Sequence, residues 1–158
     1  AKLESGQGLD RQAVEPARLG RRVLDARQIL AQRRQVTLHA ELGEAQKQKW
    51  DSLLVEQALG NLLDNAGKWA SSCILLQLEL QARQLLIRVD DDGPGIQAEQ
   101  RQQVIQRGHR QDEQTPGHGL GLAIVADIVT ALHGEFDLQD SPLGGLRVSI
   151  SLPVAAQR

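Results

Sequence analysis

The sequence contains few of the residues that mark several protein classes. A single cysteine excludes an internal disulfide and a metal site built from several cysteines. Tyr and Met are absent, Phe occurs once and Trp twice, so aliphatic side chains must fill the core. No apolar run approaches the roughly 20 residues that cross a membrane, and a net charge of −2 favours no broad attraction to nucleic acid or anionic lipid. The 158 residues, 41% hydrophobic and 24% charged, are typical of one globular domain. Because the chain begins with Ala1, we expect it to be part of a longer protein.

Apolar spacing predicts helices and strands in alternation. The predicted helices are residues 16–34, a central helix capped by Asp51 or Ser52 that runs to 69, and 120–132. The predicted strands are 36–42, 74–80, 85–91, 136–138 and 146–152. Residues 1–15 read as a linker, 43–49 as a polar loop, 97–117 as a long lid with a short helix over 98–106, and 154–158 as a tail. This order predicts a two-layer α/β sandwich with a mixed sheet of about five strands and three main helices.

The central helix has two distinct stripes. Its apolar stripe consists of Val55, Leu59, Leu62 and Ala66. A polar stripe, Asn61, Asn65 and Lys68, runs beside it. Amide oxygens can complete the shell of a Mg²⁺ that already holds phosphate oxygens, and a lysine can meet the phosphates directly. The alternative is an ordinary amphipathic helix whose asparagines hydrogen-bond locally.

Asp91 ends a strand on its apolar face. Ile87 and Val89 share that face, whereas Asp90 and Asp92 are expected to point away. A buried carboxylate needs a partner. That partner is either a group of the protein, such as a loop amide, or a ligand donor, such as an exocyclic amine.

Three glycines, at 117, 119 and 121, lead into the last predicted helix. The apolar stripe of this helix is expected to be Leu120, Ile124, Ile128, Ala131 and Leu132. Glycines at a helix N-terminus let an anion approach backbone N–H groups. The spacing is neither the dinucleotide fingerprint nor a Walker A loop, and a plain flexible loop is the alternative. Together with the amide stripe, Asp91 and the lid, however, the glycines supply metal, phosphate and base recognition for a nucleotide.

This combination resembles the ATP-binding catalytic domain of sensor histidine kinases, in the superfamily shared with gyrase, Hsp90 and MutL, and within it the PhoQ class. The N box is similar to residues 61–68, the G1 box to 91–96 and the G2 box to 117–125, and the turn 143–145 resembles a final glycine box. The resemblance implies a Bergerat-type fold over residues 16–153, with residues 1–15 ending a helical dimerisation domain.

The resemblance also implies roles for individual residues. Asn65 would hold Mg²⁺ through its side-chain oxygen, with Asn61 next to the metal and phosphates. Lys68 would contact phosphate, Trp69 would stack on adenine, and Asp91 would accept the adenine amino group. The remaining nucleotide-binding positions lie in the G1 box, the lid and the G2 box: Gly93, Gly95, Ile96, Arg110, Gly117, His118, Gly119, Leu120, Gly121 and Leu122.

Asn61 helps to distinguish ATP hydrolysis from phosphate transfer to another group. ATPase members of the superfamily place a glutamate there as the general base for water, and an amide cannot take that proton. The resemblance therefore implies ATP and Mg²⁺ as cofactors, and γ-phosphate transfer to a histidine on the dimerisation domain of the same parent protein. It also implies a response-regulator partner, a monomeric fragment of a homodimeric parent, and a cytoplasmic domain of an inner-membrane protein. The alternatives are an ATP-hydrolysing relative and a nucleotide-free interaction module.

Overall fold

The computed structural model describes residues 11–14, 16–33, 35–42, 48–81, 84–101 and 119–153. Its three long helices are α1 (Pro16–Arg33), α2 (Ser52–Trp69) and α4 (Gly119–Ala131). Its strands are β1 (Arg11–Val14), β2 (Thr37–Leu42), β3 (Gln48–Asp51), β4 (Cys73–Gln81), β5 (Gln84–Asp91), β6 (Glu135–Asp140) and β7 (Leu146–Pro153). In this part of the chain, no helix is long and apolar enough to cross a membrane.

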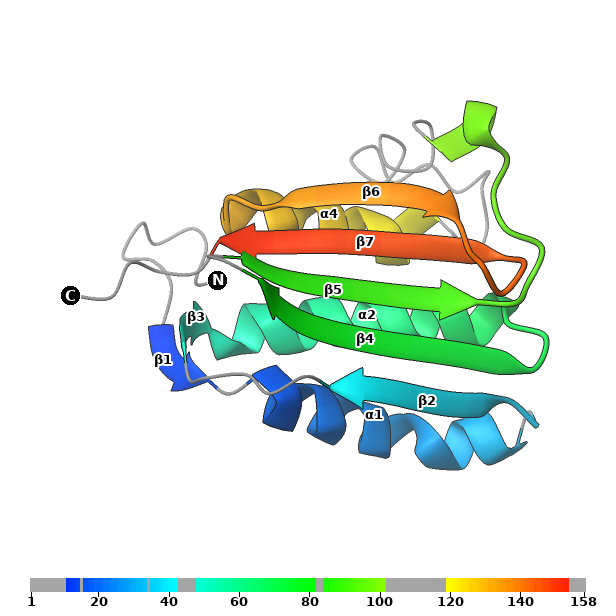
Figure 1. Ribbon diagram of the computed structural model, residues 1–158, viewed down its shortest axis with the longest axis horizontal. Coiled ribbons are helices and arrows are strands. Elements are labelled where there is room, and N and C mark those ends of the chain that lie inside the picture. The colour runs from blue at the N-terminus through cyan, green and yellow to red at the C-terminus, as the bar shows by residue number, and fades with distance from the viewer. Residues whose placement is uncertain are drawn as a thin grey trace.

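The main sheet has five strands in the order β2-β4-β5-β7-β6. Only β2 and β4 are parallel, and α2 lies in the connection between them, as a parallel crossover requires. The other neighbours pair antiparallel. All three helices cover one face of this sheet (Figure 1). The predicted two-layer α/β sandwich with a mixed sheet is therefore confirmed.

The core lies between the helices and the sheet. The predicted apolar stripe of α2 is confirmed, because all four of its side chains are buried: Val55, Leu59, Leu62 and Ala66. They meet inward side chains of the central strands, such as Leu76, Ile87 and Val89. The stripe fixes which way α2 is rotated, and so decides which residues it presents away from the core.

The predicted stripe of α4 is partly wrong. Leu122, Val125 and Val129 are fully buried, whereas Ile124 and Ala131 are only partly covered. Helix α4 packs against α2 and also against β6, so it is covered on more than one side. A helix that is apolar almost all round has no single face that its spacing could reveal.

Two short strands form a separate sheet that the sequence did not predict. β1 and β3 pair antiparallel, with Arg11 opposite Asp51 and Val14 opposite Gln48 (Figure 1). Part of the predicted linker 1–15 and the end of the predicted loop 43–49 are thus strands. Four mostly polar residues carry little strand pattern, and the pairing depends on contact between distant segments. Residues 1–10, 43–47 and 154–158 lie outside the described residues.

Candidate nucleotide-binding site

Asp91, at the end of β5, is buried with 3% of its surface exposed, as the strand alternation predicts. Its Oδ1 accepts N–H from Gly93 at 2.9 Å and from Leu146 at 3.3 Å. Burial raises the pKa of Asp91 above its ordinary value, and the charges of Asp92 and Asp90 add to this, while the two hydrogen bonds oppose it. Both hydrogen bonds recorded within the described residues fall on Oδ1. The second oxygen, Oδ2, is therefore available for a donor from a ligand.

The two flanking aspartates have structural partners on other sides. Asp90 is buried and receives a two-pronged ion pair from Arg147, at 2.8 and 3.2 Å. Asp92 accepts backbone N–H groups of residues 71–73 and the hydroxyl of Ser72 at 2.6 Å. Partial burial alone would raise the pKa of Asp92, but these hydrogen bonds outweigh it and lower the pKa to about 2. Sequence reasoning missed Arg147, because its partnership depends on the register that places it opposite Asp90.

Glycines let three backbone segments meet around Asp91. A Cβ on Gly93 would overlap the carbonyl oxygen of Trp69 at the end of α2. A Cβ on Gly145 would lie 2.6 Å from the main-chain oxygen of Asp91, and the N–H of Gly145 donates to that oxygen at 3.1 Å. Gly95 has a φ of 73°, which favours glycine. The structure thus brings together the G1 turn, Trp69 and the turn before β7. Gly145 was predicted as a turn residue in a segment that resembles a final glycine box, but not as a neighbour of Asp91.

The polar stripe of α2 divides into one buried and two more open positions. Asn65 is 5% exposed, and its buried Oδ1 has no hydrogen-bond partner among the described residues. Asn61 is half-buried, and its Nδ2 donates to the carbonyl of Gln57 at 2.9 Å. Lys68 is exposed and borders a hollow of about 210 Å³ between α1 and α2. An orphaned amide oxygen of this kind fits a hard cation, which prefers oxygen ligands.

The chain after the G1 turn is described only at its start. Ile96 is buried, and its carbonyl accepts Nε of Arg101 at 3.0 Å. Residues 98–101 are helical, the first part of the helix predicted over 98–106. Three predicted site residues lie outside the described residues: Arg110, Gly117 and His118.

The start of α4 carries the remaining predicted positions. Gly119 and Leu120 are its first residues, and nothing lies within 4 Å of a Cβ added at Gly121. Leu122 is fully buried in the core, so only its backbone is left for a ligand. The first N–H groups of any α-helix lack an acceptor within the helix, and they attract anions.

Comparison with known proteins identifies the family. Residues 50–156 match the family of histidine kinase-, DNA gyrase B-, and HSP90-like ATPases. The sensor protein kinase CarS of Pseudomonas aeruginosa is 54% identical over 105 residues, 66% of this chain and 24% of that protein. The two-component sensor PhoQ of the same organism is 45% identical over 89 residues, 56% of this chain and 20% of that protein. The solved ATP binding domain of PrrB from Mycobacterium tuberculosis has a TM-score of 0.71 and 26% identity, covering 93% of this chain and 99% of that one.

These matches define the class of the chain as a nucleotide-binding domain. The chain belongs to the family of histidine kinase-, DNA gyrase B-, and HSP90-like ATPases. Its resemblance to the catalytic domain of sensor histidine kinases, with PhoQ among the relatives, is confirmed. The chain spans about a quarter or less of the length of these two curated relatives.

Proposed function

We propose that this chain binds Mg²⁺ and ATP and donates the γ-phosphate to a histidine on a dimerisation domain of the same parent protein. The observation that carries the proposal is the buried carboxylate of Asp91. Two backbone N–H groups hold its Oδ1. The side chain is therefore fixed in place, and Oδ2 is left to accept the amino group of adenine. The description of the solved PrrB domain as ATP binding supports the same assignment.

Asn65 is the residue that fits the metal. Its side-chain oxygen is buried and has no protein partner among the described residues, which is costly unless a ligand completes it. The chemistry that Mg²⁺ would supply there is positive charge beside the phosphates. Asn61, one turn earlier on α2, would stand beside the metal and the phosphates. Lys68, Trp69 and the N–H groups at the start of α4 would complete the contacts, with Arg110 and His118 contributing from the lid.

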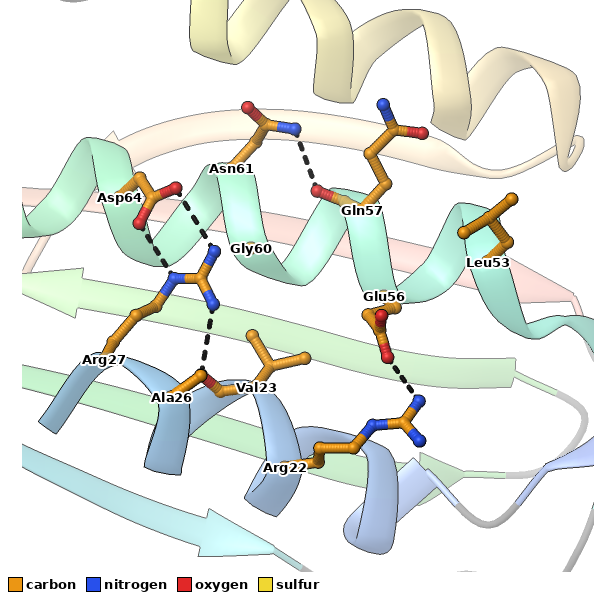
Figure 2. A pocket seen from close by; sticks show the side chains of 10 residues that line it. All are labelled: Arg22, Val23, Ala26, Arg27, Leu53, Glu56, Gln57, Gly60, Asn61 and Asp64. Atoms are coloured by element: carbon orange, nitrogen blue, oxygen red, sulfur yellow. Dashed lines mark hydrogen bonds and ion pairs between the residues drawn. The ribbon is translucent and has the colours of Figure 1, made fainter. Parts of the chain in front are cut away.

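Helix α2 offers no general base for water. Its two carboxylates, Glu56 and Asp64, both face α1 and pair with Arg22 and Arg27 (Figure 2). Asn61 borders the same groove, but its side chain is an amide that points away from α1 (Figure 2). This arrangement favours a kinase, which presents ATP to another nucleophile, over an ATPase that activates water.

The parent protein supplies the rest of the reaction. We expect it to be a homodimeric membrane sensor with this domain, residues 16–153, on the cytoplasmic side, and to pass phosphate to a response-regulator receiver domain. The small β1–β3 sheet joins the end of the expected linker to the start of α2.

Calorimetry tests the proposal. The purified chain is titrated with a non-hydrolysable ATP analogue, with and without Mg²⁺, and with the matching GTP analogue as control. Adenine-selective binding that Mg²⁺ strengthens is the expected result. Rapid ATP turnover by the chain alone would favour the ATPase instead, and failure to bind any nucleotide would favour an interaction module.

A further inference from the structure

Two ion pairs cross the groove between α1 and α2 (Figure 2). Each joins an arginine of α1 to a carboxylate of α2: Arg22 to Glu56, and Arg27 to Asp64. The groove between them has a volume of about 580 Å³. The side chain of Arg27 is 28% exposed and that of Arg22 is 69% exposed. The carboxylates show the reverse order, with Asp64 62% and Glu56 39% exposed. Such partly exposed pairs contribute little to stability, so the Arg27–Asp64 pair is of interest for the groups that it positions.

Hydrogen bonds hold the guanidinium of Arg27 on two sides. Its Nε donates to Oδ1 of Asp64 at 2.8 Å, and a terminal nitrogen donates to Oδ2 at 3.2 Å. The other terminal nitrogen donates to the carbonyl of Val23 in its own helix at 3.2 Å. A two-pronged pair fixes orientation as well as distance. The bond to Val23 anchors the group to α1, so the position of Asp64 is fixed relative to that helix.

Gly60 leaves room for this guanidinium. A Cβ at position 60 would lie 2.7 Å from a terminal nitrogen of Arg27 and 3.4 Å from its Cζ. Glycine is a poor helix former, so its place inside α2 needs a reason. At Gly67, in the same helix, nothing lies within 4 Å of an added Cβ. The space at position 60, unlike that at 67, is occupied by the arginine.

Asp64 lies in the turn of α2 that carries the two amides. Asn65 follows it directly, and Asn61 precedes it by three residues. Residues of an α-helix are spaced rigidly, by about 100° and 1.5 Å each, so fixing Asp64 fixes its neighbours. Within the described residues no hydrogen bond reaches Oδ1 of Asn65. The placement of this oxygen therefore depends on the placement of the helix.

We propose that Arg27 is a positioning residue. Acting through Asp64, with Gly60 leaving the necessary space, it holds the turn of α2 that carries Asn61 and Asn65 in register with α1. The inference rests on the proposed function, because this placement matters to the reaction only if the amides meet Mg²⁺ and phosphate. Removing a group that orients a metal ligand without itself touching the metal typically lowers metal affinity or activity about 10- to 100-fold.

The test compares matched variants of the same helices. Gly60→Ala should push the flexible end of Arg27 aside without unfolding α2, and Arg27→Gln removes the ion pair while leaving Asp64, 62% exposed, to solvent. The controls are Gly67→Ala, the same substitution in open space, and Arg22→Gln, which breaks the other pair. For each variant, the Kd of the ATP analogue is measured by calorimetry with Mg²⁺ and with a chelator, and urea unfolding of the free chain is followed in parallel.

We expect both test variants to lose about tenfold in affinity with Mg²⁺ and to keep wild-type affinity without it. Both controls should keep the wild-type Mg²⁺ dependence. Equal losses with and without Mg²⁺, in step with the urea midpoint, would show a merely structural pair and overturn the inference. Wild-type Mg²⁺ dependence in the two test variants would overturn it as well. If the wild-type chain binds the analogue with no Mg²⁺ effect or not at all, the proposed function fails first, and this role fails with it.

Discussion

Asp91→Asn separates base recognition from folding, because it keeps the shape of the side chain and removes its charge. Oδ1 of Asp91 accepts two backbone N–H groups, from Gly93 and Leu146. An amide at this position must keep its oxygen on these donors, since a flipped amide would point its NH₂ group at two N–H groups. The NH₂ group therefore replaces Oδ2, the oxygen expected to accept the amino group of adenine.

The substitution exchanges an acceptor for a donor that faces another donor. A hydrogen bond to a charged group contributes about 1.5–3 kcal/mol, so the Kd of an ATP analogue should rise about 10- to 150-fold. The free chain should not lose stability. Because burial raises the folded pKa of Asp91, its contribution to stability is complete below the ordinary value of 3.8 and is lost as the pH rises through the raised value. At pH 7 the neutral amide of the Asp91→Asn variant removes the cost of a buried charge.

The assay is calorimetry at pH 7 with analogues of ATP and of inosine triphosphate, whose base has a carbonyl oxygen where adenine has the amino group. The wild-type chain should prefer adenine. Asp91→Asn should lose or reverse that preference, because its NH₂ group can donate to the carbonyl. Urea unfolding of the same samples checks the fold. Unchanged affinity for the ATP analogue, with the adenine preference intact, would refute the assignment of Asp91 to the base.

Three further substitutions, one of them with a matched control, test other parts of the site. Gly93→Ala should destabilise the chain by about 1–3 kcal/mol in urea unfolding, because its Cβ overlaps the carbonyl of Trp69, whereas Gly121→Ala, in open space, should cost nothing. Asp92→Asn should lower the free energy of unfolding by about 1 kcal/mol at pH 7, after allowance for solvent screening. Because the folded pKa of Asp92 is about 2, its contribution to stability is present above pH 3.8 and is lost as the pH falls through about 2. The unfolding free energies of variant and wild type, measured as a function of pH, should therefore converge in acid. Asn61→Glu supplies the missing base and should raise ATP hydrolysis by the chain alone about 100-fold or more, as measured by phosphate release, and an unchanged rate would contradict the role given to this position.

The parts of the fold that follow from local periodicity could be predicted from the sequence. The stripe of α2 is such a case, because its four apolar residues recur at helical spacing and all are buried. The inward position of Asp91 follows from strict alternation after Ile87 and Val89. In both cases the pattern within one element carries the information.

The parts that the sequence did not predict depend on contacts between elements. β1 and β3 become strands only by pairing with each other, and the buried face of α4 is set by its two neighbours. The ion pair between Arg27 and Asp64 joins residues 37 positions apart, and no spacing rule within either helix indicates it. All the nucleotide- and metal-binding roles remain predictions, and Arg110, Gly117 and His118 also lie outside the described residues.

The three consecutive aspartates at the end of β5 have a consequence for strand register. If β5 slipped by one residue against its neighbours, a carboxylate would still occupy the position of Asp91, so composition alone does not protect the site. A slip would, however, separate Asp90 from Arg147 and withdraw Asp92 from the three N–H groups that it accepts. The partners of Asp90 and Asp92 thus help to fix the register of β5, and with it which of the three aspartates is expected to meet the nucleotide.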